Sequence, residues 1–83
     1  MPPSTLKRPL NPMPEFVERA LLERGLMDAY RRRPPYQRND YLGWIDRAKR
    51  EPTKLRRLAQ MLDELEQGDR YMKMAWRPSS RGR

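Results

Sequence analysis

The chain has 83 residues, no cysteine and no histidine, and a formal net charge of +8 from 19 Lys and Arg against 11 Asp and Glu. The missing residue types exclude disulfides, thiolate catalysis, cysteine zinc sites and the most common general base and metal ligand. No apolar run approaches the ~20 residues of a membrane-spanning helix, so we expect neither a membrane span nor a signal peptide. A chain of this length forms one small domain at most.

Most of the charge lies near the two ends of the chain. Residues 1–13 carry +2 and residues 68–83 carry +4, whereas residues 14–67 hold 12 basic and 10 acidic side chains. The proline-rich start and the arginine- and serine-containing end have the composition of disordered segments. We therefore predict disordered basic arms at 1–13 and 77–83 around a folded domain at 14–76.

Two helices are predicted in the first half of this domain. Pro14 suits the first turn of a helix because its missing N–H needs no partner there. The apolar residues that follow at helical spacing are Phe16, Val17, Ala20 and Leu21. Gly25 is a natural helix end. A second, short helix is expected from Leu26 to about Arg32, before Pro34-Pro35 interrupts it.

A third helix is predicted within residues 36–50. One arc of this helix is apolar, and its members are Tyr41, Trp44, Ile45 and Ala48. Aromatic residues in such an arc usually belong to the core, so we expect Trp44 to be buried. Gly43 falls on the outer face, where a glycine costs about 1 kcal/mol relative to alanine. It is either tolerated there or marks the close approach of another backbone.

The fourth helix has the strongest pattern. We expect Glu51 in the cap position, Pro52 in the first turn and Gly68 at the end. The stripe that faces the core is Leu55, Leu58, Leu62 and Leu65, flanked by Ala59 and Met61. Beyond it, residues 71–76 are predicted to run extended, with their methionines and Trp76 covering the open side of the bundle. The fold class is therefore all-α, a small bundle of three main helices plus one short helix.

The composition argues against an enzyme. Without His or Cys, catalysis would require paired carboxylates, a serine with a lysine, or a metal, and all the serines lie in the predicted arms. Asp63, Glu64 and Glu66 cluster on the fourth helix, but helical geometry fans them around the axis. We interpret them as a solvated face. We expect neither a metal nor another cofactor.

A basic corner surrounds the start of the fourth helix. Its residues are Lys49, Arg50, Thr53, Lys54, Arg56 and Arg57. Basic groups at a helix N-terminus oppose the helix dipole, and a bound anion or partner would compensate for them. Alternatively, Lys49 and Arg50 belong to the last turn of the preceding helix, where basic residues are favourable. In that case Arg56 and Arg57 pair with carboxylates such as Glu18 or Asp28. The corner also fits a DNA-reading helix-turn-helix, so these interpretations stay open.

The order of residues from Tyr41 to Leu58 resembles a known family. Tyr41-Leu42-Gly43-Trp44-Ile45 is followed by Ala48-Lys49-Arg50, Thr53, Arg56-Arg57-Leu58 and a late Gly68. This order resembles the helical domain of the YdeI/OmpD-associated (bacteriocin-protection) family of bacterial proteins, over residues 14–70. The chain departs from the family pattern before the third helix, at Arg33-Pro34-Pro35, and in the Tyr71–Trp76 segment. The resemblance implies a small all-α domain in the bacterial cytoplasm, associated with envelope stress or antimicrobial-peptide protection, without an established chemistry.

We therefore predict a monomeric, non-enzymatic protein-interaction module that uses the basic corner and two further aromatic residues, Tyr36 and Trp76. The sequence does not identify its protein partner. The alternative is a nucleic-acid-binding module that uses the same corner and the basic C-terminal arm.

Overall fold

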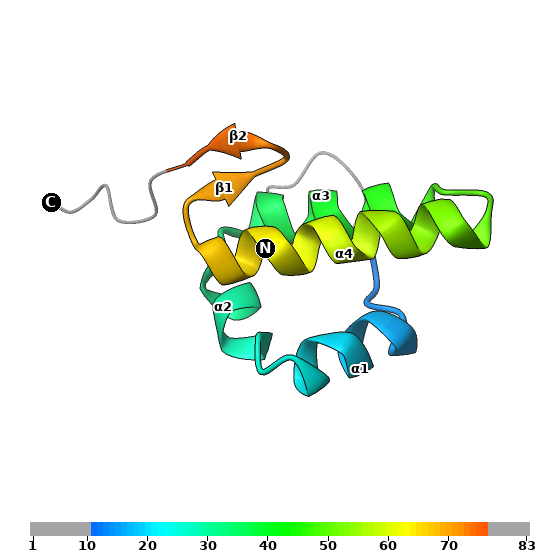
Figure 1. The fold of residues 1–83 in the computed structure, drawn as a ribbon, viewed down its shortest axis with the longest axis horizontal. Helices are drawn as coiled ribbons and strands as arrows, with labels where there is room; N and C mark the ends of the chain where they lie inside the picture. The colour runs from blue at the N-terminus through cyan, green and yellow to red at the C-terminus, as the bar shows by residue number, and fades with distance from the viewer. Residues whose placement is uncertain (1–10, 77–83) are drawn as a thin grey trace, which may run out of the picture.

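The computed structural model describes residues 11–76, in which four helices are followed by a short β-hairpin (Figure 1). The elements in chain order are α1 (Glu15–Glu23), α2 (Met27–Arg32), α3 (Pro35–Asp46), α4 (Glu51–Gln67), β1 (Arg70–Tyr71) and β2 (Met74–Ala75). This confirms the all-α class with three main helices and one short helix. The predicted disordered arms fall mostly on residues 1–10 and 77–83, which lie outside the described residues.

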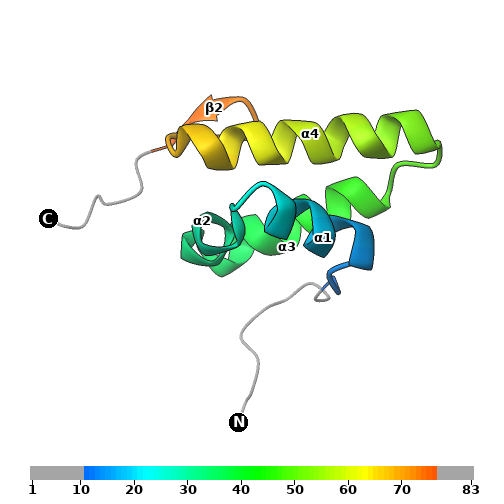
Figure 2. The same cartoon turned by 60° about the horizontal axis from the view of Figure 1, so that its bottom comes forward.

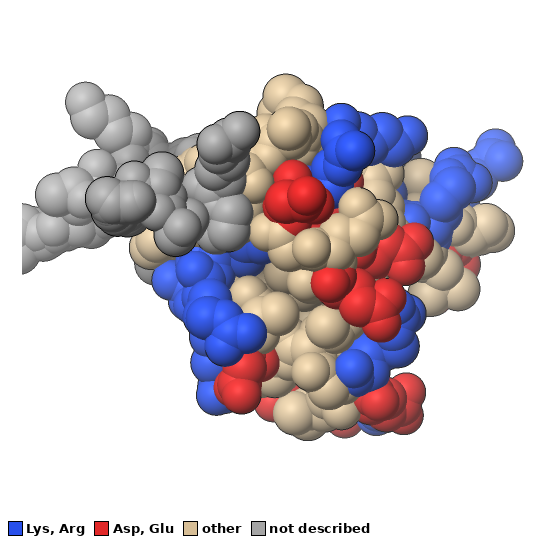
Figure 3. All heavy atoms as spheres, turned by 60° about the vertical axis from the view of Figure 1, so that its left-hand side comes forward, with Lys and Arg blue, Asp and Glu red and all other residues tan. Residues whose placement is uncertain are grey.

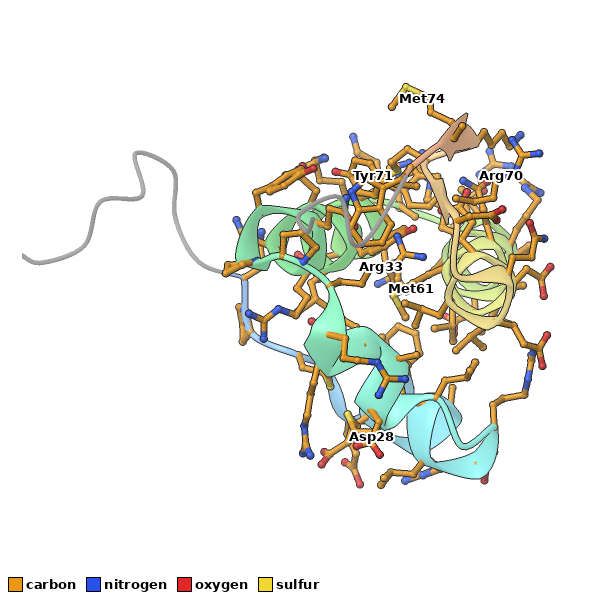
Figure 4. The ribbon with its side chains drawn as sticks, turned by 90° about the vertical axis from the view of Figure 1, so that its left-hand side faces the viewer. Asp28, Arg33, Met61, Arg70, Tyr71 and Met74 are labelled. Atoms are coloured by element: carbon orange, nitrogen blue, oxygen red, sulfur yellow. The ribbon has the colours of Figure 1, made fainter. Side chains whose placement is uncertain are left out.

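The long helices α3 and α4 run antiparallel and side by side, and α1 with α2 completes the bundle on one side of this pair (Figures 1 and 2). Seen along α4, the hairpin lies over the junction between α3 and α4, opposite α1 (Figure 4). Among the described residues, no helix combines the length and the hydropathy needed to cross a membrane.

Two helix ends follow directly from glycine. Gly25 after α1 has a φ of 68° and Gly68 after α4 has a φ of 85°, a left-handed conformation that glycine adopts without a steric penalty. Both ends were predicted. At its start, α4 includes Glu51, and Arg50 rather than Glu51 occupies the cap position. The predicted start is therefore wrong by one residue.

The core lies between α1, α3 and α4. Its fully buried apolar side chains are Val17, Leu21, Tyr41, Ile45 and Met61, each contributing about 1.5–3 kcal/mol by leaving water. On α4 the buried stripe is Leu58, Met61, Leu62 and Leu65, whereas Leu55 is 49% exposed. The prediction for Leu55 is wrong because the first turns of α4 extend beyond the helices that would cover them (Figure 1).

Trp44 is the second correction to the predicted core. Its side chain is half-buried and packs against the core from outside. On α3 the fully buried apolar side chains are Tyr41 and Ile45. At 100° per residue, Trp44 points about 60° to one side of Tyr41 and about 100° to the same side of Ile45. It therefore lies at the edge of the apolar arc and remains partly accessible.

Gly43 is buried on α3, not exposed on the outer face as predicted. A Cβ atom at this position would lie 2.7 Å from Asn11 Nδ2. Asn11 is held against α3 because its backbone N–H donates to Asn39 Oδ1 at 2.7 Å, and Nδ2 donates to the Asn39 carbonyl oxygen at 3.1 Å. The close approach anticipated at Gly43 comes from a side chain rather than from a backbone.

Residues 70–75 differ most from the prediction. They form an antiparallel hairpin in which Arg70 pairs with Ala75 and Tyr71 pairs with Met74. The two turn residues, Met72 and Lys73, have φ values of 51° and 66°, as a two-residue type I′ turn requires. The segment therefore folds back on itself, and its two halves pair as the two strands of the hairpin. Tyr71 and Met72 pack against the core, but Met74 is 58% exposed, so the predicted cover by both methionines is only partly present.

Candidate functional site

A polar groove with a volume of about 810 Å³ runs along one face of α4. Its lining residues on α4 recur every three or four positions, as one helix face requires. These residues are Thr53, Arg56, Arg57, Ala59, Gln60, Asp63, Glu64 and Gln67. Trp44 of α3 lines it too, and the hairpin contributes Arg70 and Lys73. We refer to this feature as the α4 groove.

The structure divides the predicted basic corner. Thr53, Arg56 and Arg57 line the α4 groove, whereas the other three members, Lys49, Arg50 and Lys54, do not. Instead, the groove combines two corner arginines with Arg70 and Lys73, which lie more than ten residues further along the chain. Sequence reasoning missed these two because nothing local indicates that residues 70–73 fold back along α4.

Arg57 is fixed in place by Trp44. Its Nη1 donates to the Trp44 carbonyl oxygen at 2.7 Å, and its guanidinium carbon lies 5.3 Å from the centre of the Trp44 ring. The last carbonyls of a helix lack partners within the helix, so this contact also caps the end of α3. The predicted pairing of Arg57 with carboxylates such as Glu18 or Asp28 is not the contact that the structure shows.

Glu64 is buried, with 4% of its surface exposed, and the prediction that it belongs to a solvated face is wrong. Its carboxylate accepts hydrogen bonds from the backbone N–H groups of Met72 at 2.8 Å and of Lys73 at 2.7 Å. It also accepts from the Tyr41 hydroxyl and from Gln60 Nε2 at 3.1 Å. Glu64 thus fixes the hairpin turn to α4. The sequence contains one indication of this burial, because Glu64 lies three residues after Met61, on the inner side of the helix.

The other two members of the acidic cluster on α4, Asp63 and Glu66, are also engaged. Arg24, which follows α1, lies 3.6 Å from Asp63 Oδ1 and 3.2 Å from Glu66 Oε1. On the molecular face shown in Figure 3, basic side chains gather at the upper right and along the left side, with acidic side chains next to them and between them. No group of three acidic side chains that could hold a metal ion occurs within residues 11–76.

The two predicted interaction aromatics lie elsewhere. Tyr36 packs edge-on against Tyr71, with ring centres 5.8 Å apart. Trp76 lies under the Arg33 guanidinium at 4.4 Å and lines a separate pocket of about 340 Å³. Neither residue lines the α4 groove, and both make contacts inside the domain. The structure therefore does not combine them with the basic corner into one surface.

Arg33 was missed by sequence reasoning. It is buried between α2 and α4 (Figure 4), where Nη1 donates to Gln37 Oε1 at 3.0 Å and Nη2 donates to the Glu64 carbonyl oxygen at 2.9 Å. The position follows two exposed arginines, and nothing in the sequence distinguishes it from them.

The helices that line the groove lie within the part of the chain that matches a known protein family. A family model described as bacteriocin-protection, YdeI or OmpD-associated matches residues 12–68. The chain belongs to this family. The match confirms the resemblance and covers α1 to α4, whereas the hairpin that supplies Arg70 and Lys73 lies beyond it. A search of the curated proteins and a search of the solved structures each give no match.

Proposed function

We propose that the chain is a non-enzymatic protein-interaction module that binds an acidic segment of a partner protein in the α4 groove. Membership of the bacteriocin-protection, YdeI or OmpD-associated family is consistent with a role associated with such protection. We propose that the module serves that role by binding, as a monomer in the bacterial cytoplasm, and that it performs no catalysis.

The observation that carries the proposal is an excess of cations in the groove that have no ion pair within residues 11–76. These cations are Arg56, Arg57, Arg70 and Lys73. The two carboxylates that share the lining are already engaged, Asp63 with Arg24 and Glu64 with the hairpin amides. A concave surface with this charge distribution is complementary to a negatively charged ligand.

The same cations make nucleic-acid binding the second candidate. Thr53 and Arg56 lie near the start of α4, which extends beyond α3 and α1 (Figure 1), so a phosphate backbone can reach them. Against this candidate, the Asp63 side chain is 65% exposed beside the groove, and its pair with Arg24 at 3.6 Å only partly offsets its charge, so it disfavours a phosphate next to it. An acidic peptide can place its carboxylates away from Asp63, because neutral residues can separate its acidic ones, whereas a nucleic acid carries a charge at every nucleotide.

An amide-resolved NMR titration separates the two candidates. The probes are a peptide of about twelve Glu, Gly and Ser residues and a short DNA duplex, each at low and near-physiological salt. We expect the peptide to shift the amides of Thr53, Gln60 and Gln67 at both salt concentrations. The double variant Arg56→Gln/Arg70→Gln should bind it about fivefold to twentyfold more weakly, since each exposed pair contributes up to about 1 kcal/mol.

Lys49→Gln/Lys54→Gln is the matched control, because it removes two positive charges from the basic corner but none from the groove lining. Its affinity for the peptide should stay close to that of the unaltered chain. Tighter duplex binding that falls with salt by a slope near −0.9 per phosphate contact would favour the nucleic-acid candidate. An unchanged spectrum with both probes would contradict both candidates.

A further inference from the structure

We propose that the α4 groove selects an extended segment whose two carboxylates stand about 10 Å apart, because Glu64 holds the two cationic ends of the groove at that separation. The inference rests on the proposed function and adds the geometry of the ligand. It follows from how each end of the groove is fixed to α4.

The first cationic end is Arg56 and Arg57. Arg57 has little freedom, since its guanidinium donates to the Trp44 carbonyl oxygen at 2.7 Å and covers the Trp44 ring. A long side chain that is already held loses less rotamer entropy when an anion binds. The positive charge at this end of the groove therefore has a fixed position.

The second cationic end is Arg70 and Lys73 on the hairpin. The hairpin is short and on its own would be marginally stable, so its position depends on its attachment to α4. The Glu64 carboxylate fixes the turn to α4 by accepting the backbone N–H groups of both turn residues, Met72 and Lys73. The strand before the turn is held separately, because the Tyr71 hydroxyl donates to Asp40 Oδ2 of α3 at 2.6 Å. The turn thus lies at the level of Glu64, seven residues from Arg57. Seven residues of α-helix rise about 10.5 Å.

The lining favours an extended ligand over a helical one. A bound amphipathic helix inserts apolar side chains at positions i, i+3, i+4 and i+7 into an apolar groove, but only Trp44 and Ala59 among the lining residues are apolar. In a polyproline II segment, residues i and i+3 lie on the same side and about 9.3 Å apart. Two acidic residues with that spacing match both cationic ends.

Three stiff peptides of equal charge test this geometry. Each carries two glutamates in a proline-rich frame that stays extended. The glutamates are separated by two prolines, adjacent to each other, or separated by five prolines, which places them about 9, 3 and 19 Å apart along the segment. We expect the first peptide to bind the unaltered chain about fivefold more tightly than the other two, because only it engages both ends at once.

The variant Glu64→Gln tests the role of the anchor. The amide nitrogen of the introduced glutamine cannot accept a hydrogen bond, so one hairpin N–H loses its partner. Because the hairpin is then held less firmly, the preference for the first peptide should fall to less than about twofold. Asp63→Asn is the matched control. It also removes one negative charge from the groove lining but does not contact the hairpin amides, and it should keep the full preference.

Equal binding of the three peptides to the unaltered chain would overturn this inference and leave the proposed function intact. Binding of none of them would contradict both. A folded Glu64→Gln variant that keeps the full preference would show that Glu64 does not set the spacing. The comparison of peptides on the unaltered chain decides the spacing itself even if that variant fails to fold.

Discussion

At the scale of single residues, Gly43 and Asn11 form a matched pair. Asn11 lies before α1, and its side chain occupies the space that a Cβ atom at position 43 would fill. The two Nδ2 hydrogen bonds to Asn39 hold it there, each at 3.1 Å. Glycine inside a helix normally weakens it, but at position 43 it permits a contact that attaches the segment before α1 to α3.

This pairing predicts that the effect of Gly43→Ala changes sign with its neighbour. In the unaltered chain, alanine gains about 1 kcal/mol of helix propensity but displaces Asn11 and loses hydrogen bonds of about 0.5–1.5 kcal/mol each, so stability should stay level or fall. In an Asn11→Ala background the same substitution should stabilise the domain by about 1 kcal/mol. Urea unfolding of the four proteins measures the coupling. Equal effects in both backgrounds would refute it.

At the scale of the elements, the sequence predicts the helices well and the hairpin poorly. Each helix is bounded by a proline or a glycine whose backbone preference does not depend on the rest of the fold. The hairpin has strands of two residues, and its turn is Met72-Lys73 rather than a pair that favours positive φ, such as Asn-Gly. Its stability comes from contacts with other elements, since Glu64 of α4 accepts its turn amides and Tyr71 and Met72 pack against the core.

The same reason explains what could be predicted of the candidate site. Arg56 and Arg57 were found because they follow a corner that the sequence marks with Pro52. Arg70 and Lys73 depend on the tertiary position of the hairpin. The burial of Arg33 and Glu64 was missed because each charge is stabilised by partners that are remote in sequence, which a helical pattern does not contain.

The turn conformation gives a prediction for the hairpin. Lys73 has a φ of 66°, which costs a residue with a Cβ atom roughly 1–2 kcal/mol, while glycine loses about 0.5–1 kcal/mol through the entropy of the unfolded chain. Lys73→Gly should therefore be more stable than Lys73→Ala by up to about 1 kcal/mol. Both variants remove the ammonium group, so the comparison isolates the backbone. The measurement is the free energy of unfolding, together with amide exchange at Met74.

Arg70 supplies the control for this comparison. It lies in strand β1, where glycine has no conformational advantage, so Arg70→Gly should be less stable than Arg70→Ala. If glycine were the more stable residue at both positions, the left-handed turn would not be the cause.

At the scale of the whole molecule, one buried polar network connects the elements. Arg33, in the turn of the chain that joins α2 to α3, donates to the backbone of α4, and the Glu64 side chain joins α4 to Tyr41 of α3 and to the hairpin. A fully satisfied network of this kind specifies one arrangement of the elements, whereas removing one partner leaves a buried polar group unpaired. The small apolar core of an 83-residue chain therefore depends on a few polar contacts for its uniqueness.

This network makes the stability of the whole domain depend on pH in the alkaline range. Burial, and then the hydrogen bond to Glu64, raise the pKa of Tyr41 far above its usual value. Burial also raises the pKa of Tyr30, although the Arg38 cation opposes the shift. In the unfolded chain both hydroxyls titrate near pH 10. Above that pH the unfolded state binds fewer protons than the folded state, so the free energy of unfolding falls as pH rises.

Tyr41→Phe isolates the contribution of Tyr41. Between about pH 8 and pH 9 the unaltered chain should show no loss of stability from its tyrosines, and above about pH 10 the free energy of unfolding should fall by up to about 1.4 kcal/mol per pH unit for each shifted tyrosine. The variant should be less stable near neutral pH, because Glu64 loses a partner, but its slope above pH 10 should be shallower. Urea unfolding over this range measures both proteins, and lysine deprotonation affects them equally. Parallel curves would show that Tyr41 is not the residue that couples proton loss to unfolding.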